Sequence, residues 1–160
     1  MHVLGEQFKK AANLDLVHVP FKGVAQSVTA AIAGQVNVIW MPTSGNLRHF
    51  GSGALRVLAT SSPKRTALLP DAPTMIELGY RDMDAVAWFG LLAPLATPPA
   101  IIGRVNREVN AVLAAADVRA GLTSAGYVPE GGTPEALAAL MRSDDVRYRR
   151  LVAETGVKAD

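Results

Sequence analysis

Residues 16–27 read LVHVPFKGVAQS, and this stretch decides the fold class of the chain. Its apolar start predicts a buried strand, and the Lys22-Gly23 pair predicts a tight turn into a helix. A strand that enters a helix through a glycine turn leaves free backbone N–H groups at the positive end of the helix dipole. Such a terminus can bind an anion. The plain alternative, in which Gly23 is only a turn residue between a strand and a helix, stays open.

The first half of the chain alternates between strand and helix patterns. Val24, Val28 and Ile32 recur every fourth residue in the helix that follows the turn, and Gly34 is placed to end it. The other segments are a helix over 3–12, strands over 16–19, 36–40 and 55–60, and a short helix capped by Thr43 or Ser44 that ends near Gly51 or Gly53. Such alternation predicts an α/β fold with βαβ units and a mostly parallel sheet.

The second half is mainly helical, and its composition changes near residue 95. Ala85–Ala93 is almost wholly apolar and predicts a buried strand. The remaining expectations are a loop over Ser61–Pro73, a capping box at Thr74–Glu77 that opens a short helix closed by Gly79, a helix from Thr97-Pro98-Pro99, a short helix capped by Asp117 that ends at Ser124, and a last long helix from Thr133-Pro134-Glu135.

Composition excludes several classes of function. The chain has 160 residues, of which 49% are hydrophobic and none is cysteine, so a core is feasible and thiolate chemistry is not. A net charge of +2 with scattered basic residues does not indicate nucleic-acid binding. No apolar run reaches the roughly 20 residues that cross a bilayer. The first residues also lack the pattern of a signal peptide.

Catalytic and cofactor motifs are missing from the sequence. His2, His18 and His49 do not have the spacing of metal ligands, and His18 is interpreted as a core or edge histidine of a strand. No phosphate-binding loop or nucleophile elbow occurs. We therefore expect no metal, no cofactor and no catalytic residue. A hydrolase that pairs Ser27 or Ser44 with His18 or His49 is the less favoured alternative.

Two segments combine polar groups at the carboxyl ends of predicted parallel strands. These are Pro20–Ala25 and Trp40–Ser44. Open α/β sheets bind ligands in the crevice outside such strand ends. Backbone N–H groups, one lysine, hydroxyls and aromatic walls suit the binding of a small anion more than its chemical conversion.

Short motifs along the whole chain resemble those of one family. The best of them is VHVPFKG at 17–23. The others lie at residues 4–8, 34–36, 55–59, 69–74, 87–94, 97–99, 106–110 and 131–135. In this order they resemble the C-terminal part of the Bug-type periplasmic receptors of tripartite tricarboxylate transporters.

The resemblance implies a type II periplasmic-binding-protein fold, in which one lobe is inserted into another. Residues 1–86 then correspond to the inserted ligand-binding lobe with a parallel-rich sheet. Residues 87–160 correspond to a crossing strand and the C-terminal helices of an incomplete first lobe. The chain departs from the family pattern because it carries no export signal and starts near the first helix of the inserted lobe. We therefore expect a truncated receptor whose helices at 98–115 and 133–155 expose apolar faces.

For function, the resemblance implies a non-enzymatic receptor that binds a small carboxylate or dicarboxylate and delivers it to the membrane subunits of the tripartite transporter. The implied ligand-binding residues are Lys22, Gly23, Val24 and Ala25, with Met41 and Thr43 as a second group. The implied compartment is the periplasm, whereas a chain without an export signal is expected in the cytoplasm. A protein-interaction module or a remnant without ligand binding stays open as the alternative.

Overall fold

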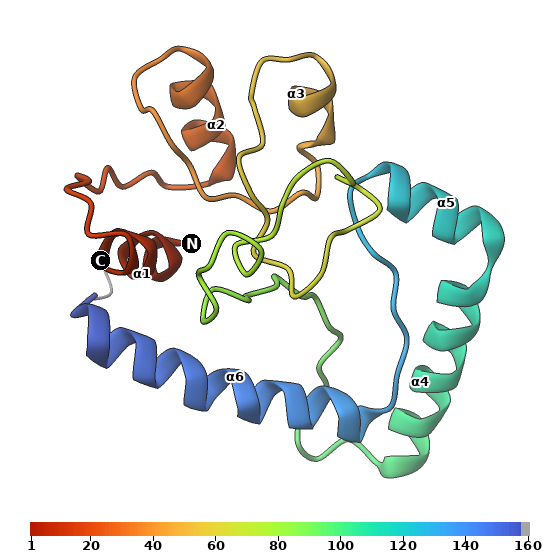
Figure 1. Ribbon diagram of the computed structural model, residues 1–160. Coiled ribbons are helices and arrows are strands. Elements are labelled where there is room, and N and C mark those ends of the chain that lie inside the picture. The colour runs from red at the N-terminus through yellow and green to blue at the C-terminus, as the bar shows by residue number, and fades with distance from the viewer. Residues whose placement is uncertain (158–160) are drawn as a thin grey trace. The chain divides into compact units, whose positions relative to one another are not determined.

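The computed structural model of the chain describes residues 1–157, and it folds them into six α-helices joined by extended and irregular segments (Figure 1). Two compact units divide the chain. Unit 1 comprises Met1–Ala87 together with the chain from Arg150 onward, and unit 2 comprises Trp88–Arg149. The assignment of 1–86 and 87–160 to two lobes of a receptor stays a prediction.

Unit 1 contains the two helices that the apolar periodicity predicted. These are α1, His2–Ala11, and α2, Val24–Ile32. Gly34, at φ +71°, ends α2 as expected. There the N–H of Gln35 donates to the carbonyl of Ala30 at 2.9 Å, and the N–H of Gly34 donates to Ala31 at 3.0 Å. This double hydrogen bond is the Schellman arrangement, which needs a residue that tolerates the left-handed conformation.

The start of the third helix differs from the prediction. Helix α3 is Leu47–Gly51, so its end near Gly51 is confirmed, but its N-cap is Asn46 and not Thr43 or Ser44. The N–H of Asn46 closes a turn on the carbonyl of Thr43 at 3.0 Å. The Asn46 side-chain amide also donates to the carbonyls of Pro42 and Ser44, at 3.0 and 2.9 Å. These bonds keep residues 43–46 in a turn, and the helix therefore begins later.

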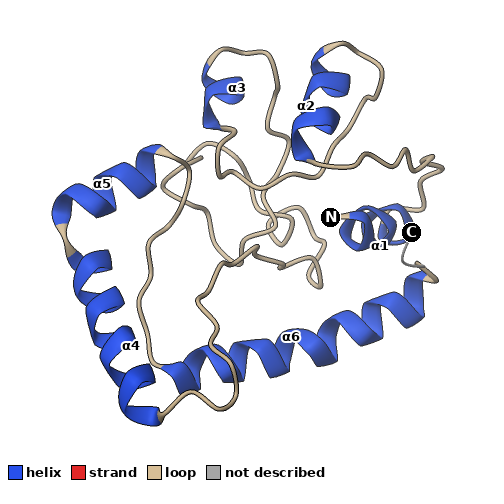
Figure 2. Ribbon diagram, turned by 180° about the vertical axis from the view of Figure 1, so that it is seen from behind, coloured by secondary structure: helices blue, strands red, loops and turns tan. Residues whose placement is uncertain are grey.

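The predicted parallel sheet is not formed in the described residues. The segments 16–19, 36–40, 55–60 and 85–93 contain no assigned strand, and Figure 2 shows them as loop. One parallel bridge joins Thr60 to Thr74, with hydrogen bonds from Thr60 N–H to Pro73 and from Met75 N–H to Thr60. A strand exists only where a neighbour completes its ladder of hydrogen bonds. Apart from this bridge, the four segments lack such a neighbour within residues 1–157.

The capping box at Thr74 is present, but the helix after it is only a turn. The N–H of Thr74 donates to the Glu77 carboxylate at 2.7 Å, and the N–H of Glu77 donates to the Thr74 hydroxyl at 3.1 Å. Gly79, at φ +95°, ends the turn as predicted. The prediction of a helix was wrong because only four residues lie between Thr74 and Gly79, and a segment of this length is too short to propagate a helix.

All of the buried hydrophobic side chains in the described residues belong to unit 1. They are Leu4, Val28, Ala30, Ala72, Met83, Ala85 and Leu151. Phe8 adds aromatic contacts, with ring centroids 5.2 Å from Tyr80 and 5.8 Å from Trp40. The ammonium group of Lys10 donates to the carbonyl of Glu154 at 3.3 Å, which fastens the chain after Arg150 to α1.

Unit 2 contains helix α4 (Pro99–Ala114) and helix α5 (Ala116–Ser124). Helix α6 spans Pro134–Thr155, and its residues up to Arg149 belong to unit 2. The proline at the start of α4 is confirmed, whereas the N-cap of α5 is Ala115 and Asp117 lies inside its first turn. At the start of α6 the Thr133 hydroxyl accepts from the N–H of Ala136 at 3.2 Å. Hydrogen bonds from its own backbone N–H and from Thr133 lower the pKa of Glu135.

An asparagine on α4 holds the glycine pair that precedes α6. The Asn110 amide oxygen accepts from the N–H of Gly132 at 2.8 Å, and its Nδ2 donates to the Gly132 carbonyl at 3.0 Å. Asn106 adds a second donor to the same carbonyl at 2.9 Å. The backbone of Gly131 passes so close to Asn110 that a Cβ there would overlap the amide oxygen.

The segment after Ala85 is exposed, contrary to the prediction of a buried strand. Phe89, Leu91 and Leu92 are 72%, 70% and 71% exposed. Within unit 2 the Trp88 indole donates to Asp144 at 2.7 Å, and the ring of Phe89 lies 5.5 Å from that of Tyr127. Ile101, Val105 and Val112 on α4 and Leu140 and Met141 on α6 are also exposed. The expectation that these two helices expose apolar faces is therefore confirmed.

In the part of the chain that the structure describes, no helix combines the length and the hydrophobicity that a membrane span requires.

The glycine at 131 gives a test of the Asn110 contacts. We expect Gly131→Ala to lower the free energy of unfolding by about 1–3 kcal/mol, because the new methyl group displaces the Asn110 side chain. Gly121→Ala in α5 is the matched control, since its Cβ would meet nothing within 4 Å. This control should raise stability by about 0.5–1 kcal/mol. Urea denaturation followed by circular dichroism measures both, and equal effects would contradict the contact.

The Glu77 carboxylate should make stability depend on pH. The N–H of Thr74, then Arg65, holds the pKa of Glu77 below its ordinary value of 4.5. The stabilisation is therefore complete above the unfolded pKa and is lost as the pH falls through the lower folded one. Glu77→Gln keeps an acceptor for Thr74 but cannot titrate. We expect it to flatten the acid limb of a plot of unfolding midpoint against pH, and an acid limb as steep as that of the unchanged chain would contradict this role of Glu77.

Candidate functional site

The start of α2 presents a row of unengaged backbone N–H groups. Gly23 is the N-cap, in an extended conformation, and it has no side chain that could bond the first turn. Among the described residues, the N–H groups of Gly23, Val24, Ala25 and Gln26 donate to no acceptor. The N–H of Lys22 is engaged, because it donates to Gln26 Oε1 at 3.2 Å. The geometry therefore offers several amide donors to an anion.

These donors lie on an exposed surface. Residues 21–26 are exposed, including the side chain of Lys22. A cation beside unengaged amides at the positive end of a helix favours a carboxylate over a neutral ligand. At this exposed surface, water screens the electrostatic attraction between a carboxylate and the start of α2 more than it would in the crevice that the sequence predicted.

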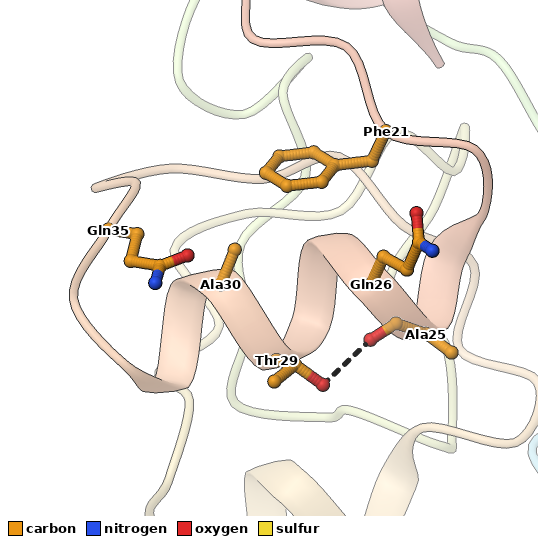
Figure 3. Close-up of a pocket in the computed structure, with 6 residues that line it drawn as sticks. All are labelled: Phe21, Ala25, Gln26, Thr29, Ala30 and Gln35. Atoms are coloured by element: carbon orange, nitrogen blue, oxygen red, sulfur yellow. Dashed lines mark hydrogen bonds between the residues drawn. The ribbon is translucent and has the colours of Figure 1, made fainter.

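A hollow of about 310 Å³ adjoins the first turns of α2. It is lined by Phe21, Ala25, Gln26, Thr29, Ala30 and Gln35. Figure 3 shows the ring of Phe21 lying over the helix, with Gln26 on one side of the ring and Gln35 on the other. Of the predicted site residues, Ala25 lines this hollow, whereas Lys22, Gly23 and Val24 do not.

The second predicted group lies in the segment before α3. Met41 and Thr43 are half-buried in the irregular segment before α3. The Thr43 carbonyl accepts from Asn46 within the turn described above. Helices α2 and α3 project from the same side of unit 1 in Figures 1 and 2. The two groups stay separate candidates.

Sequence reasoning missed the two glutamines as parts of the candidate site, whereas Phe21 lay in the predicted segment Pro20–Ala25 without being named as a ligand-binding residue. A signal for Gln26 was present, because it stands three residues after the N-cap Gly23, where a Gln or Glu side chain can reach back to a backbone N–H. Gln35 carries no such signal. Phe21 precedes the helix and Gln35 follows it, so only the return of the chain brings them together.

The histidines are arranged differently from the prediction. His18 is exposed and residues 16–19 form no assigned strand, so its interpretation as a core or edge histidine of a strand was wrong, and its ring stacks on that of His2 with centroids 3.7 Å apart. The Ser27 hydroxyl donates to the Val24 carbonyl at 2.8 Å, and the Ser52 hydroxyl donates to the His49 carbonyl at 3.3 Å. Within residues 1–157 no group of three or more His, Asp or Glu side chains could hold a metal ion.

The whole described chain matches one protein family. Residues 1–157 match TctC, which is described as the tripartite tricarboxylate transporter family receptor. Protein BugT of Bordetella pertussis is 33% identical over 98% of this chain and 48% of its own length.

Two solved structures from Rhodopseudomonas palustris are similar in fold. One, solved with adipate, has a TM-score of 0.88 and 26% identity over 97% of this chain and 52% of its own. The other is MatC with bound malate, with a TM-score of 0.77 and 26% identity over 94% of this chain and 52% of its own.

The chain spans about half the length of most of the curated relatives that it matches. The match nevertheless covers every described residue, and it includes the helix whose first amides are unengaged. This chain therefore belongs to the TctC family of tripartite tricarboxylate transporter receptors.

Proposed function

We propose that this chain is the ligand-binding part of a periplasmic solute receptor for small dicarboxylates, and that the start of α2 binds one carboxylate group. The observation that carries the proposal is the row of unengaged amides at Gly23, Val24 and Ala25 beside Lys22. Relatives solved with adipate and with malate support the ligand class, since both molecules are small dicarboxylates. The family description supports the receptor role.

The expected affinity follows from the number of donors. A hydrogen bond between a backbone N–H and a carboxylate contributes about 1.5–3 kcal/mol, and less at an exposed site. A receptor of two lobes gains from closure, because contacts from both lobes stabilise only the closed state. The amide donors at α2 form one group of such contacts, and they lie on an exposed surface where water weakens each hydrogen bond. We therefore expect dissociation constants in the millimolar range or weaker.

The rest of the proposal concerns the whole receptor. Met41 and Thr43 are the second group of ligand contacts, supplied from the segment before α3. The four extended segments pair into a parallel-rich sheet when further strands of a receptor lie beside them. The loaded receptor delivers its ligand to membrane subunits of the tripartite transporter, without catalysing a reaction.

A second candidate function, a protein-interaction module, is favoured by the exposed apolar residues of unit 2. Phe89, Leu91 and Leu92 are all more than two-thirds exposed and lie in one uncharged segment. Contiguous apolar surface of this kind marks sites where another chain binds.

The carboxylate site can be tested by removing one amide donor. Val24 is the first residue of α2, where proline is tolerated, so Val24→Pro deletes one N–H and keeps the helix. We expect Val24→Pro to weaken adipate and malate binding about tenfold, because one charge-assisted hydrogen bond is lost. Val24→Ala keeps the N–H and should bind as the unchanged chain does. Amide shifts of residues 23–26 in ¹⁵N NMR titrations measure both.

The titration has two outcomes that contradict the proposal. One is the absence of shifts at residues 23–26 with either dicarboxylate at tens of millimolar. The other is equal binding by Val24→Pro and Val24→Ala. Micromolar binding by the unchanged chain would contradict only the expected weakness.

Size-exclusion chromatography with light scattering tests the second candidate. If unit 2 binds other chains through its apolar segment, the purified protein should elute as a discrete oligomer. Leu91→Asp combined with Leu92→Asp should return it to a monomer, because buried unpaired charges are costly. A clean monomer of the unchanged chain would contradict the interaction module.

A further inference from the structure

We propose that the hollow beside α2 holds the methylene chain of an aliphatic dicarboxylate, and that Phe21 thereby makes the site prefer longer ligands. This inference rests on the proposed function, because it assumes that one carboxylate of the same ligand is bound by the amides of Gly23–Ala25. It adds the part of the ligand that those amides do not contact.

The lining of the hollow suits an apolar chain. The ring of Phe21 forms one wall, and the methyl group of Ala30 points toward it from the helix in Figure 3. Ala30 is only 3% exposed and contributes a small apolar methyl group, whereas Phe21 is 37% exposed and can cover a ligand. The Thr29 hydroxyl is turned to the Ala25 carbonyl, to which it donates at 3.0 Å. The hollow thus gains little polarity from Thr29.

Two carboxamides line the hollow, and Figure 3 shows them on opposite sides of the Phe21 ring. The Nε2 of Gln26 and the side chain of Gln35 make no hydrogen bond with the described residues, although Gln26 Oε1 accepts from the N–H of Lys22. Both can donate to a carboxylate oxygen without adding charge. An apolar middle between two such donors matches a molecule with an aliphatic chain and a carboxylate at each end.

The hollow and the amide row are close enough for one ligand to use both. Ala25 and Gln26 belong to both, and each residue of an α-helix rises only 1.5 Å. A ligand whose carboxylate meets the first amides of α2 therefore has its next carbons at the edge of the hollow. A volume of about 310 Å³ lies at the lower limit of small-molecule sites, which suits a ligand of this size.

The test is a homologous series of dicarboxylates, from succinate to glutarate, adipate and pimelate, titrated against the 160-residue chain by ¹⁵N NMR. A fully buried methylene improves binding about fourfold, so in this open hollow we expect about twofold for each added methylene. Phe21→Ala should remove this dependence on chain length and leave succinate binding unchanged. Phe89→Ala, which removes an exposed phenylalanine of unit 2, is the matched control and should keep the dependence.

The series separates this inference from the proposed function. Val24→Pro should weaken all four ligands by the same factor and preserve the dependence on chain length. If Val24→Pro acts in this way but affinity does not rise with chain length, or rises equally in Phe21→Ala, the inference about the hollow is wrong and the carboxylate site stands. If chain length matters and only Phe21→Ala changes it, with no effect of Val24→Pro, the hollow binds the ligand and the carboxylate site is wrong.

Discussion

The N-cap of α2 is Gly23, which has no side chain that could accept hydrogen bonds from the first N–H groups of the helix, and the candidate site depends on this constraint. Serine, threonine, aspartate or asparagine at the N-cap would place a side-chain oxygen on those N–H groups. Gly23 supplies no such oxygen, and the nearby Gln26 reaches back only to Lys22. The donors therefore stay available to an external anion. Because the chain belongs to a receptor family, we propose that these available donors serve to bind a ligand.

The helices were predictable from the sequence because their signals are local. Apolar periodicity and the glycine at position 34 fixed α2, and the prolines fixed the start of α4. The predicted N-caps of α3 and α5 were wrong. For α3, the turn at Asn46 depends on side-chain hydrogen bonds that apolar periodicity does not reveal. The strands were not recovered, because a strand depends on a neighbour that the segment's own residues do not specify. The hollow could not be predicted, since Phe21 and Gln35 meet only after the chain turns back.

The two units differ in how far they bury their apolar side chains. Unit 1 encloses Leu4, Val28 and Leu151, the last from the end of α6. Unit 2 contains polar contacts such as those of Asn110 with Gly132 and of Trp88 with Asp144, and many of its large apolar side chains, among them Phe89, Leu91 and Leu92, are exposed. Polar contacts of this kind fix the path of the backbone but contribute little of the free energy that burial supplies.

The hydrogen bond between Gln26 Oε1 and the N–H of Lys22 makes this side chain an intramolecular competitor. Because it is tethered four residues away, its oxygen acts at an effective concentration on the order of millimolar, whatever the solute level outside. A carboxylate that engages the uncompeted amides of Gly23 and Val24 needs no such displacement, whereas one that also takes the Lys22 amide must release Gln26 first. If the start of α2 binds a carboxylate as proposed, its occupancy has an easier stage and a harder one, and the Gln26 rotamer separates the two.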